Sequence, residues 1–147
     1  MKSSTPKANP KIQSAALQPH EGRTLKASEV VVDAQGHPSL NASRCKDCGL
    51  SVFPPSAVCP DCLSVNQQAL CLSGSGKLYS YTQIHVAPPT WVVPYIIGYV
   101  DLPEGVRLFG KVDAKSTEVL KVDMPVEVEV VVTESEGQYR YSFAPQG

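Results

Sequence analysis

The sequence lacks several features that mark common protein classes. No run approaches the ~18 consecutive apolar residues that a membrane helix needs, and the first lysines are not followed by the apolar stretch of a secretory signal. Basic residues are not in excess, since 13 Lys and Arg stand against 14 Asp and Glu. These absences argue against a membrane protein, a secreted protein and a dedicated nucleic-acid binder. They predict a cytoplasmic location.

Residue sets typical of autonomous catalysis are also missing. The sequence has no Ser/His/Asp order, no paired Glu acid–base signature, no Gly-rich phosphate loop and no H-E-x-x-H motif. His20, His37 and His85 are far apart in the sequence, and we expect His85 to be a surface or packing residue of a strand. Cys71 stands apart from the other cysteines and is expected to be a small buried hydrophobe. The chain therefore shows no catalytic set of its own.

The composition allows one ordinary domain or two small ones, and the pattern divides the chain into three parts. Residues 1–28 are rich in Lys, Ser, Pro and Ala and predict an N-terminal arm, either a mobile tail or a segment that orders on a partner. Residues 29–73 contain a predicted hairpin, with a turn at 34–37, and then four cysteines. Residues 74–147 alternate between strand and turn patterns.

The C-terminal part predicts a small barrel. The expected strands are 77–86, 95–102, 106–112, 125–132 and 138–143, with a short helix possible at 115–120. In the first strand, Leu78, Ser80, Thr82, Ile84 and Val86 are expected to share one face. In the last strand, the aromatic side chains fall on one side. Five short strands in about 75 residues favour a closed or half-closed barrel and a mainly β fold.

The strongest motif is a pair of C-x₂-C sequences, formed by Cys45, Cys48, Cys59 and Cys62 with ten residues between the pairs. Two residues between cysteines let both sulfurs reach one metal from a tight turn, whose backbone N–H groups stabilise the thiolates. Gly49, after the first pair, suits a turn with positive φ, and Pro60 stiffens the second pair. The gap is shorter than the usual ribbon spacing of about 15 to 20, so we expect an abbreviated zinc ribbon.

The number of ligands indicates the role of the metal. Four thiolates in a tetrahedral arrangement favour zinc, with iron in a rubredoxin-like electron carrier as the main alternative. Four cysteines leave no open position for a water or a substrate, so the metal is expected to be structural rather than catalytic. A small segment cannot bury enough apolar surface alone, and the metal supplies the missing stability.

Several motifs, taken in order, resemble the DUF35 family, which joins a rubredoxin-like zinc ribbon to an OB-fold. They are Arg44–Gly49, Phe53-Pro54-Pro55, Cys59–Cys62, Gly74–Thr82, Pro94–Leu102, Glu104–Gly110 and Met124–Val128. The resemblance covers about residues 29–145. Asp123 departs from it, because the family usually has Gly there, so the resemblance does not extend to the shape of this one turn.

The resemblance implies an accessory subunit that pairs with a thiolase-like enzyme or a related acyl-CoA lyase or hydratase. The partner would carry the nucleophilic cysteine and the histidines, and the OB-fold would contact the partner and help to bind the acyl-CoA. One complex that fits is a benzoylsuccinyl-CoA thiolase of anaerobic toluene degradation, whose small subunit looks similar.

Coenzyme A combines anionic phosphates with a narrow pantetheine arm, so its binding residues would be basic side chains and apolar or aromatic surface. The candidates are Arg44, Lys46, Lys77, Arg107 and Lys111 for the phosphates, and Tyr79, Trp91, Pro94 and Tyr95 for the arm. For each basic residue taken alone, a solvated surface charge is the simpler interpretation. Trp91, between prolines, could be a core residue or an interface anchor.

A single-stranded nucleic-acid-binding module is the main alternative function, since zinc ribbons and OB-folds both serve that purpose. From Leu72 to the C-terminus, however, the sequence has six basic and nine acidic residues, a balance of −3. Aromatic residues such as Tyr79 and Tyr81 could stack bases, but without a basic groove the affinity would be low.

Overall fold

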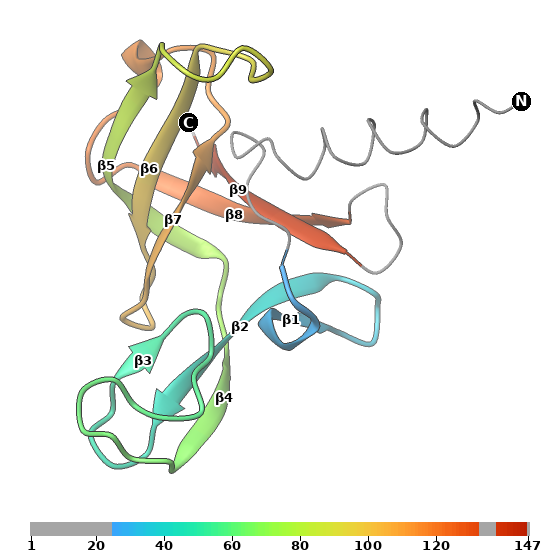
Figure 1. The fold of residues 1–147 in the computed structure, drawn as a ribbon, viewed down its shortest axis with the longest axis vertical. Coiled ribbons are helices and arrows are strands. Elements are labelled where there is room, and N and C mark those ends of the chain that lie inside the picture. The colour runs from blue at the N-terminus through green and yellow to red at the C-terminus, as the bar shows by residue number, and fades with distance from the viewer. Residues whose placement is uncertain (1–24, 133–137, 147) are drawn as a thin grey trace, which may run out of the picture.

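A small ribbon sheet lies against one end of a closed barrel in the computed structural model, which describes residues 25–132 and 138–146 (Figure 1). The strands are β1 (Val30–Val32), β2 (Pro38–Cys45), β3 (Ser51–Val52), β4 (Gln67–Cys71), β5 (Ser75–Ile84), β6 (Tyr95–Asp101), β7 (Arg107–Val112), β8 (Pro125–Val132) and β9 (Tyr139–Pro145). Two 3₁₀ turns, η2 (Ala27–Glu29) and η3 (Thr117–Val119), are the only helical elements in these ranges. Neither has the length or apolarity to cross a membrane. The predicted mainly β fold is confirmed.

The ribbon sheet is organised around β2. Its first half pairs with β1, and its second half lies between β3 and β4. The predicted hairpin at 29–44 is confirmed, with a turn in which Asp33 Oδ1 accepts hydrogen bonds from the backbone N–H groups of Gln35 and His37. Strand β4 was not predicted, because its sequence begins with two glutamines and pairing with β2, rather than propensity, makes it a strand.

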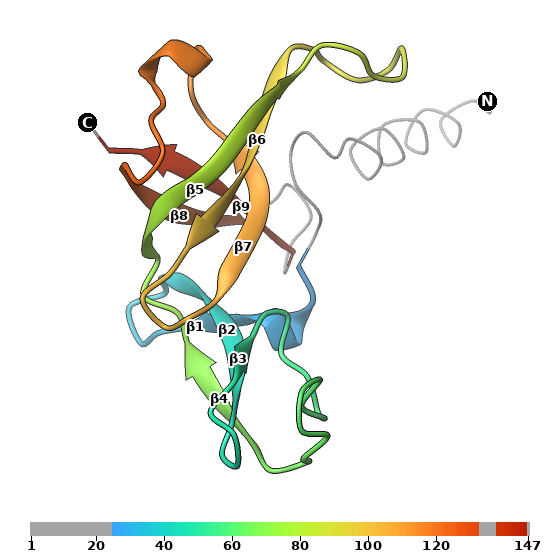
Figure 2. The same ribbon diagram turned by 90° about the vertical axis from the view of Figure 1, so that its left-hand side faces the viewer.

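The barrel contains the five predicted strands in the order β5-β6-β7-β9-β8. Neighbours are antiparallel except for β7 and β9, which run parallel. Figure 2 shows that the loop joining β5 to β6 lies at the end of the barrel remote from the ribbon, whereas the turn joining β6 to β7 lies next to the ribbon. A ligand or partner at one end of the barrel would therefore also meet the ribbon, whereas one at the other end would meet the β5–β6 loop.

A bulge in β5 corrects the predicted faces of that strand. The pairing with β6 passes from Leu78 opposite Val100 to Ser80 opposite Tyr99, so Tyr79 is an extra residue. Beyond the bulge the alternation is reversed, and Tyr81 packs against the core. The expectation that Ser80, Thr82, Ile84 and Val86 share the face of Leu78 is therefore wrong.

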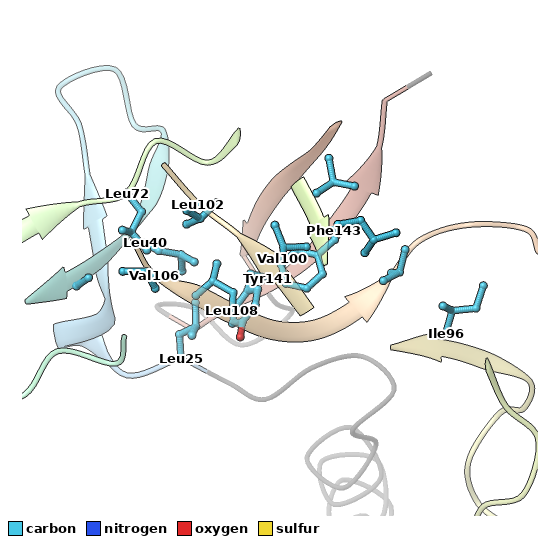
Figure 3. Packing of buried hydrophobic residues seen from close by; sticks show 14 of the residues in the cluster. Leu25, Leu40, Leu72, Ile96, Val100, Leu102, Val106, Leu108, Tyr141 and Phe143 are labelled. Atoms are coloured by element: carbon cyan, nitrogen blue, oxygen red, sulfur yellow. The ribbon is translucent and has the colours of Figure 1, made fainter. Parts of the chain in front are cut away.

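One hydrophobic core extends from the ribbon into the barrel (Figure 3). Leu40 and Leu72 of the ribbon side join Leu102 and Val106 of the β6–β7 turn, and all four are at most 5% exposed. The predicted aromatic face of the last strand is confirmed, because Tyr139, Tyr141 and Phe143 all contribute to this core. A shared core holds the ribbon in a defined position on the barrel.

Two smaller expectations need revision, and a third concerns residues 1–28. Cys71 is exposed rather than buried, because Leu70, its neighbour in β4, takes the side facing the core. The helix expected at 115–120 is only the short turn η3, in which the N–H of Glu118 donates to Ser116 Oγ. Most of the predicted arm, residues 1–24, lies outside the described residues.

Candidate functional site

The four cysteines of the motif form one cluster at the tip of the ribbon sheet. Their sulfur atoms all lie within 4.8 Å of one another, and the Cys45–Cys62 and Cys48–Cys59 pairs are each 3.5 Å apart. A tetrahedral zinc ion with Zn–S bonds of about 2.3 Å would place its ligands about 3.8 Å apart. The arrangement therefore fits a zinc ion held by four thiolates, as the spacing predicted.

The two cysteine pairs have the same backbone geometry. The carbonyl of Cys45 accepts a hydrogen bond from the N–H of Gly49, and the carbonyl of Cys59 accepts one from Leu63, both at 2.9 Å. The N–H groups of Cys45 and Cys59 in turn donate to the residues that follow each turn, Leu50 and Ser64, both at 2.8 Å. The metal centre is therefore built from two equivalent turns that face each other.

Each turn needs a residue in the left-handed region. Gly49 has φ = +84°, as the sequence predicted, and the equivalent residue of the second turn is Leu63 with φ = +63°. A side chain in this region costs roughly 1–2 kcal/mol. Leu63 is 72% exposed and gains little packing in compensation, so the second turn contains local strain that the sequence alone did not reveal.

Removing the side chain at residue 63 and adding one at residue 49 should therefore have opposite effects on the free energy of unfolding. We expect Leu63→Gly to raise the free energy of unfolding by roughly 0.5 kcal/mol, because the relief of strain exceeds the added entropy of the unfolded chain. Gly49→Ala should lower it by about 1 kcal/mol, from strain alone, since a Cβ there meets no atom within 4 Å. Thermal unfolding of the zinc-loaded protein measures both. Leu63→Ala is the matched control, and equal losses for Leu63→Gly and Leu63→Ala would contradict the assignment of strain.

Backbone N–H groups tune the cysteine thiols. The N–H of Cys48 lies 3.5 Å from Cys45 Sγ and lowers the pKa of Cys45 to about 6. The N–H of Cys62 lowers the pKa of Cys59 in the same way. The N–H of Ser64 lowers the pKa of Cys62, but hydrogen bonds to the other cysteine sulfurs outweigh it and raise that pKa to about 12. Four sulfurs this close can all be thiolates only around a cation, which is the role of zinc.

Asp47 provides a second connection between the two turns, which the sequence reading did not identify. Its carboxylate accepts hydrogen bonds from Ser64 Oγ and, at 3.5 Å, from Asn66 Nδ2. Both partners follow the second cysteine pair, so the aspartate of the first turn is hydrogen-bonded to the residues that follow the second.

All four ligand positions of the metal centre belong to cysteines, which leaves none for a reacting molecule. The geometry supports a structural zinc.

The nine residues proposed for coenzyme A fall in three separate places. Arg44 and Lys46 are exposed on the ribbon, next to Cys45. The others divide between the two ends of the barrel, with Lys77, Tyr79 and Arg107 near the ribbon and Trp91, Pro94, Tyr95 and Lys111 at the remote end. The structure therefore does not bring all nine into one site.

The group near the ribbon is partly neutralised. Arg107 Cζ lies 3.6 Å from the centre of the Tyr79 ring, and its guanidinium bonds both carboxylate oxygens of Asp101 at 2.5 and 2.9 Å. These hydrogen bonds lower the pKa of Asp101, which is therefore ionised at neutral pH. Arg107 is consequently presented as a stacked, paired cation rather than an unpaired one.

Three of the four residues at the remote end line a hollow. An open depression of about 380 Å³ is lined by Pro94, Tyr95, Lys111 and neighbouring residues. The Trp91 ring lies against Tyr95, with 6.5 Å between the ring centres, and Lys111 Nζ is 3.3 Å from Asp113 Oδ1. The Trp91 side chain is half-buried and reaches the depression only through its contact with Tyr95.

An exposed aromatic pair was missed by the sequence reading. Tyr99 and Phe109 are directly opposite each other on β6 and β7, 43% and 49% exposed, with ring centres 5.1 Å apart. Together with Tyr79 and Arg107 they form what we call the aromatic patch. The available signal was the alternation, because Val100 and Leu108, next to them in sequence, are the buried residues of these strands.

Comparisons with known proteins agree with this architecture. Residues 36–65 match the family model "ChsH2, rubredoxin-like zinc ribbon domain", and residues 71–131 match "ChsH2, C-terminal OB-fold domain". The chain is also similar to a solved structure described as "Ltp2-ChsH2(DUF35) aldolase", with 29% identity and a TM-score of 0.61 over 73% of this chain and 84% of the other.

Two curated relatives carry informative descriptions. A DUF35 domain-containing scaffold protein of Methanocaldococcus jannaschii is 34% identical over 69% of this chain and 78% of its own length. The benzoylsuccinyl-CoA thiolase subunit BbsA of Thauera aromatica is 38% identical over 52% of this chain, which spans about half (53%) of that relative. With both domains matched in order and the metal ligands in place, this chain belongs to the DUF35 family of zinc-ribbon and OB-fold proteins.

Proposed function

We propose that this chain is a non-catalytic subunit that assembles with a thiolase-like enzyme and helps to bind its acyl-CoA substrate. The observation that carries the proposal is the four-cysteine metal centre. Among the described residues it is a cluster of reactive side chains in which all four sulfurs are needed to hold the metal, so none is left for catalysis. Relatives described as a scaffold protein and as a thiolase subunit support an assembly role.

The aromatic patch is the surface that we assign to the partner. Protein interfaces are enriched in aromatic residues and Arg, and three aromatic rings and Arg107 share this face of the barrel. The Asp101–Arg107 pair holds the guanidinium over the Tyr79 ring, so the face is pre-organised before a partner binds.

The depression at the remote end of the barrel is the better candidate for the acyl-CoA. It combines an apolar and aromatic lining with Lys111, and Lys115 also borders it. A pantetheine arm would lie along Pro94 and Tyr95, and a phosphate would approach the lysines. Arg44 and Lys46 are on the ribbon, so they would reach the same ligand only if the partner completed the site.

The nucleic-acid alternative gains little from this geometry. The cation of the aromatic patch, Arg107, is paired with Asp101. A backbone-tracking groove needs cations that face the phosphates. Asp101 would repel phosphates at this patch, which favours a protein partner for the same aromatic residues.

Co-expression with a thiolase-like subunit tests the proposal, and the catalytic partner of a benzoylsuccinyl-CoA thiolase is the first to try. We expect a complex stable to gel filtration. Phe109→Ala should weaken it roughly tenfold or more, as for an interface anchor, and the exposed ribbon variant Val65→Ala should not. Lys111→Ala should leave assembly intact and raise the KM for acyl-CoA. Two chains that elute separately, with the thiolase fully active alone, would refute the proposed role.

A further inference from the structure

The seam that closes the barrel, between β7 and β9, is its least paired junction. These strands share a single register pair, Val112 with Phe143, at the end remote from the ribbon. The bonds that reinforce it are at the same end, where the N–H of Asp113 donates to the carbonyl of Phe143 at 2.8 Å. By contrast, β6–β7 and β8–β9 are in register along most of their length. The other end of the seam needs a different support.

Tyr141 provides that support. Its hydroxyl donates a 2.5 Å hydrogen bond across the seam to the backbone carbonyl of Phe109. The ring can approach because the neighbouring residue of β7 is Gly110, where a Cβ would lie 3.1 Å from the Tyr141 ring. Phe109 in turn carries the ring that pairs with Tyr99 on the outer surface. Tyr141 is 8% exposed, so its hydrogen bond is shielded from water.

A residue of the zinc ribbon also contacts the Tyr141 ring. Phe53 meets the Tyr141 ring edge to face, with ring centres 6.1 Å apart and an interplanar angle of 86°. Phe53 lies in the middle of the ten residues between the two cysteine pairs. On one side, β3 pairs with β2, and on the other the N–H of Ser56 donates to Ser43 Oγ at 2.9 Å.

We propose that Phe53 and Tyr141 are positioning residues through which the zinc ribbon holds the barrel seam closed and fixes the Tyr99–Phe109 pair. The metal centre sets the ends of the segment that carries Phe53, Phe53 packs on Tyr141, and the Tyr141 hydroxyl holds the backbone of Phe109. This coupling lies within the chain, so it does not depend on the identity of a partner enzyme.

Hydrogen–deuterium exchange and NMR of the zinc-loaded, full-length protein test this coupling. In Phe53→Ala, one zinc per chain should remain, and amides of β7 and β9 should exchange about tenfold faster, because an edge-to-face pair and its buried area are lost. The ring resonances of Tyr99 and Phe109 should shift. Amides in the middle of the β5–β6 hairpin should be unchanged, and Val58→Ala, in the same segment and 43% exposed, should change none of these signals.

Tyr141→Phe separates coupling from simple loss of packing. It keeps the ring against Phe53 but removes the hydroxyl, so it should loosen the seam and shift the Phe109 signals while the ribbon amides stay protected. If Phe53→Ala does not fold, Phe53→Leu and Tyr141→Phe provide the same comparison. Wild-type exchange in β7 and β9, with unshifted Tyr99 and Phe109 resonances in Tyr141→Phe, would overturn the proposal.

Discussion

Replacing Cys48 with serine should abolish stoichiometric zinc binding, unfold the tip of the ribbon and prevent partner assembly. Three thiolates would remain, and a serine hydroxyl does not ionise near neutral pH to replace the fourth. Structural zinc contributes about 10–16 kcal/mol of folding free energy in small zinc modules. The cysteine turns gain little from apolar packing, since Leu50, Val58, Leu63 and Val65 are all at least 37% exposed.

Metal analysis, limited proteolysis and gel filtration with the partner check this prediction. Cys71→Ser is the matched control, because Cys71 is an exposed cysteine outside the cluster. It should retain one zinc, resist protease as the wild type does and bind the partner. A Cys48→Ser protein that kept its zinc would disprove the ligand assignment. One that lost zinc but assembled normally would show that the ribbon is dispensable for the partner.

The metal centre could be predicted from the sequence because the residues that form it lie close together along the chain. Two residues between Cys45 and Cys48 fix a turn, and Gly49 signals the positive φ that the turn needs. The equivalent turn at Cys59 has the same geometry with Leu63 in the glycine position, and no sequence rule assigns a leucine to that conformation. Asp123 is a milder case. It stands where the family usually has Gly and adopts φ = +72°, in the left-handed region that Gly reaches most readily and Asp tolerates better than most residues.

The barrel surface was harder to predict, because exposure depends on register and on pairing between distant strands. One bulge at Tyr79 reverses the faces of the rest of β5, and alternation in the sequence contains no sign of it. Arg107 was a reasonable phosphate ligand by residue type, but the register places it opposite Asp101, which binds its guanidinium. The number of barrel strands and their order along the chain depend on hydrophobic periodicity and were predictable. The pairwise contacts between them were not.

The barrel core should respond very differently from the barrel surface to the same substitution. Phe143 is fully buried, and its backbone forms the single register pair of the β7–β9 seam. Phe143→Ala should therefore lower the free energy of unfolding by about 3–5 kcal/mol, from lost burial and an unfilled cavity. Because small domains are stable by only about 5–15 kcal/mol, this variant should be close to unfolding at 37 °C. Urea denaturation of the zinc-loaded protein measures the loss.

Phe109→Ala is the matched control for that measurement. It removes the same atoms from the adjacent strand, but Phe109 is 49% exposed and packs on Tyr99 rather than in the core. Its truncation should cost about 1 kcal/mol or less, while weakening the complex with a thiolase-like partner. Equal losses of stability in the two variants would mean that Phe109 is a core residue, and the aromatic patch would then be part of the barrel's own packing. A large loss of stability for Phe143→Ala would identify the residue that maintains the fold. A small loss for Phe109→Ala, with loss of assembly by a protein that is still folded, would identify the residue that serves the interface.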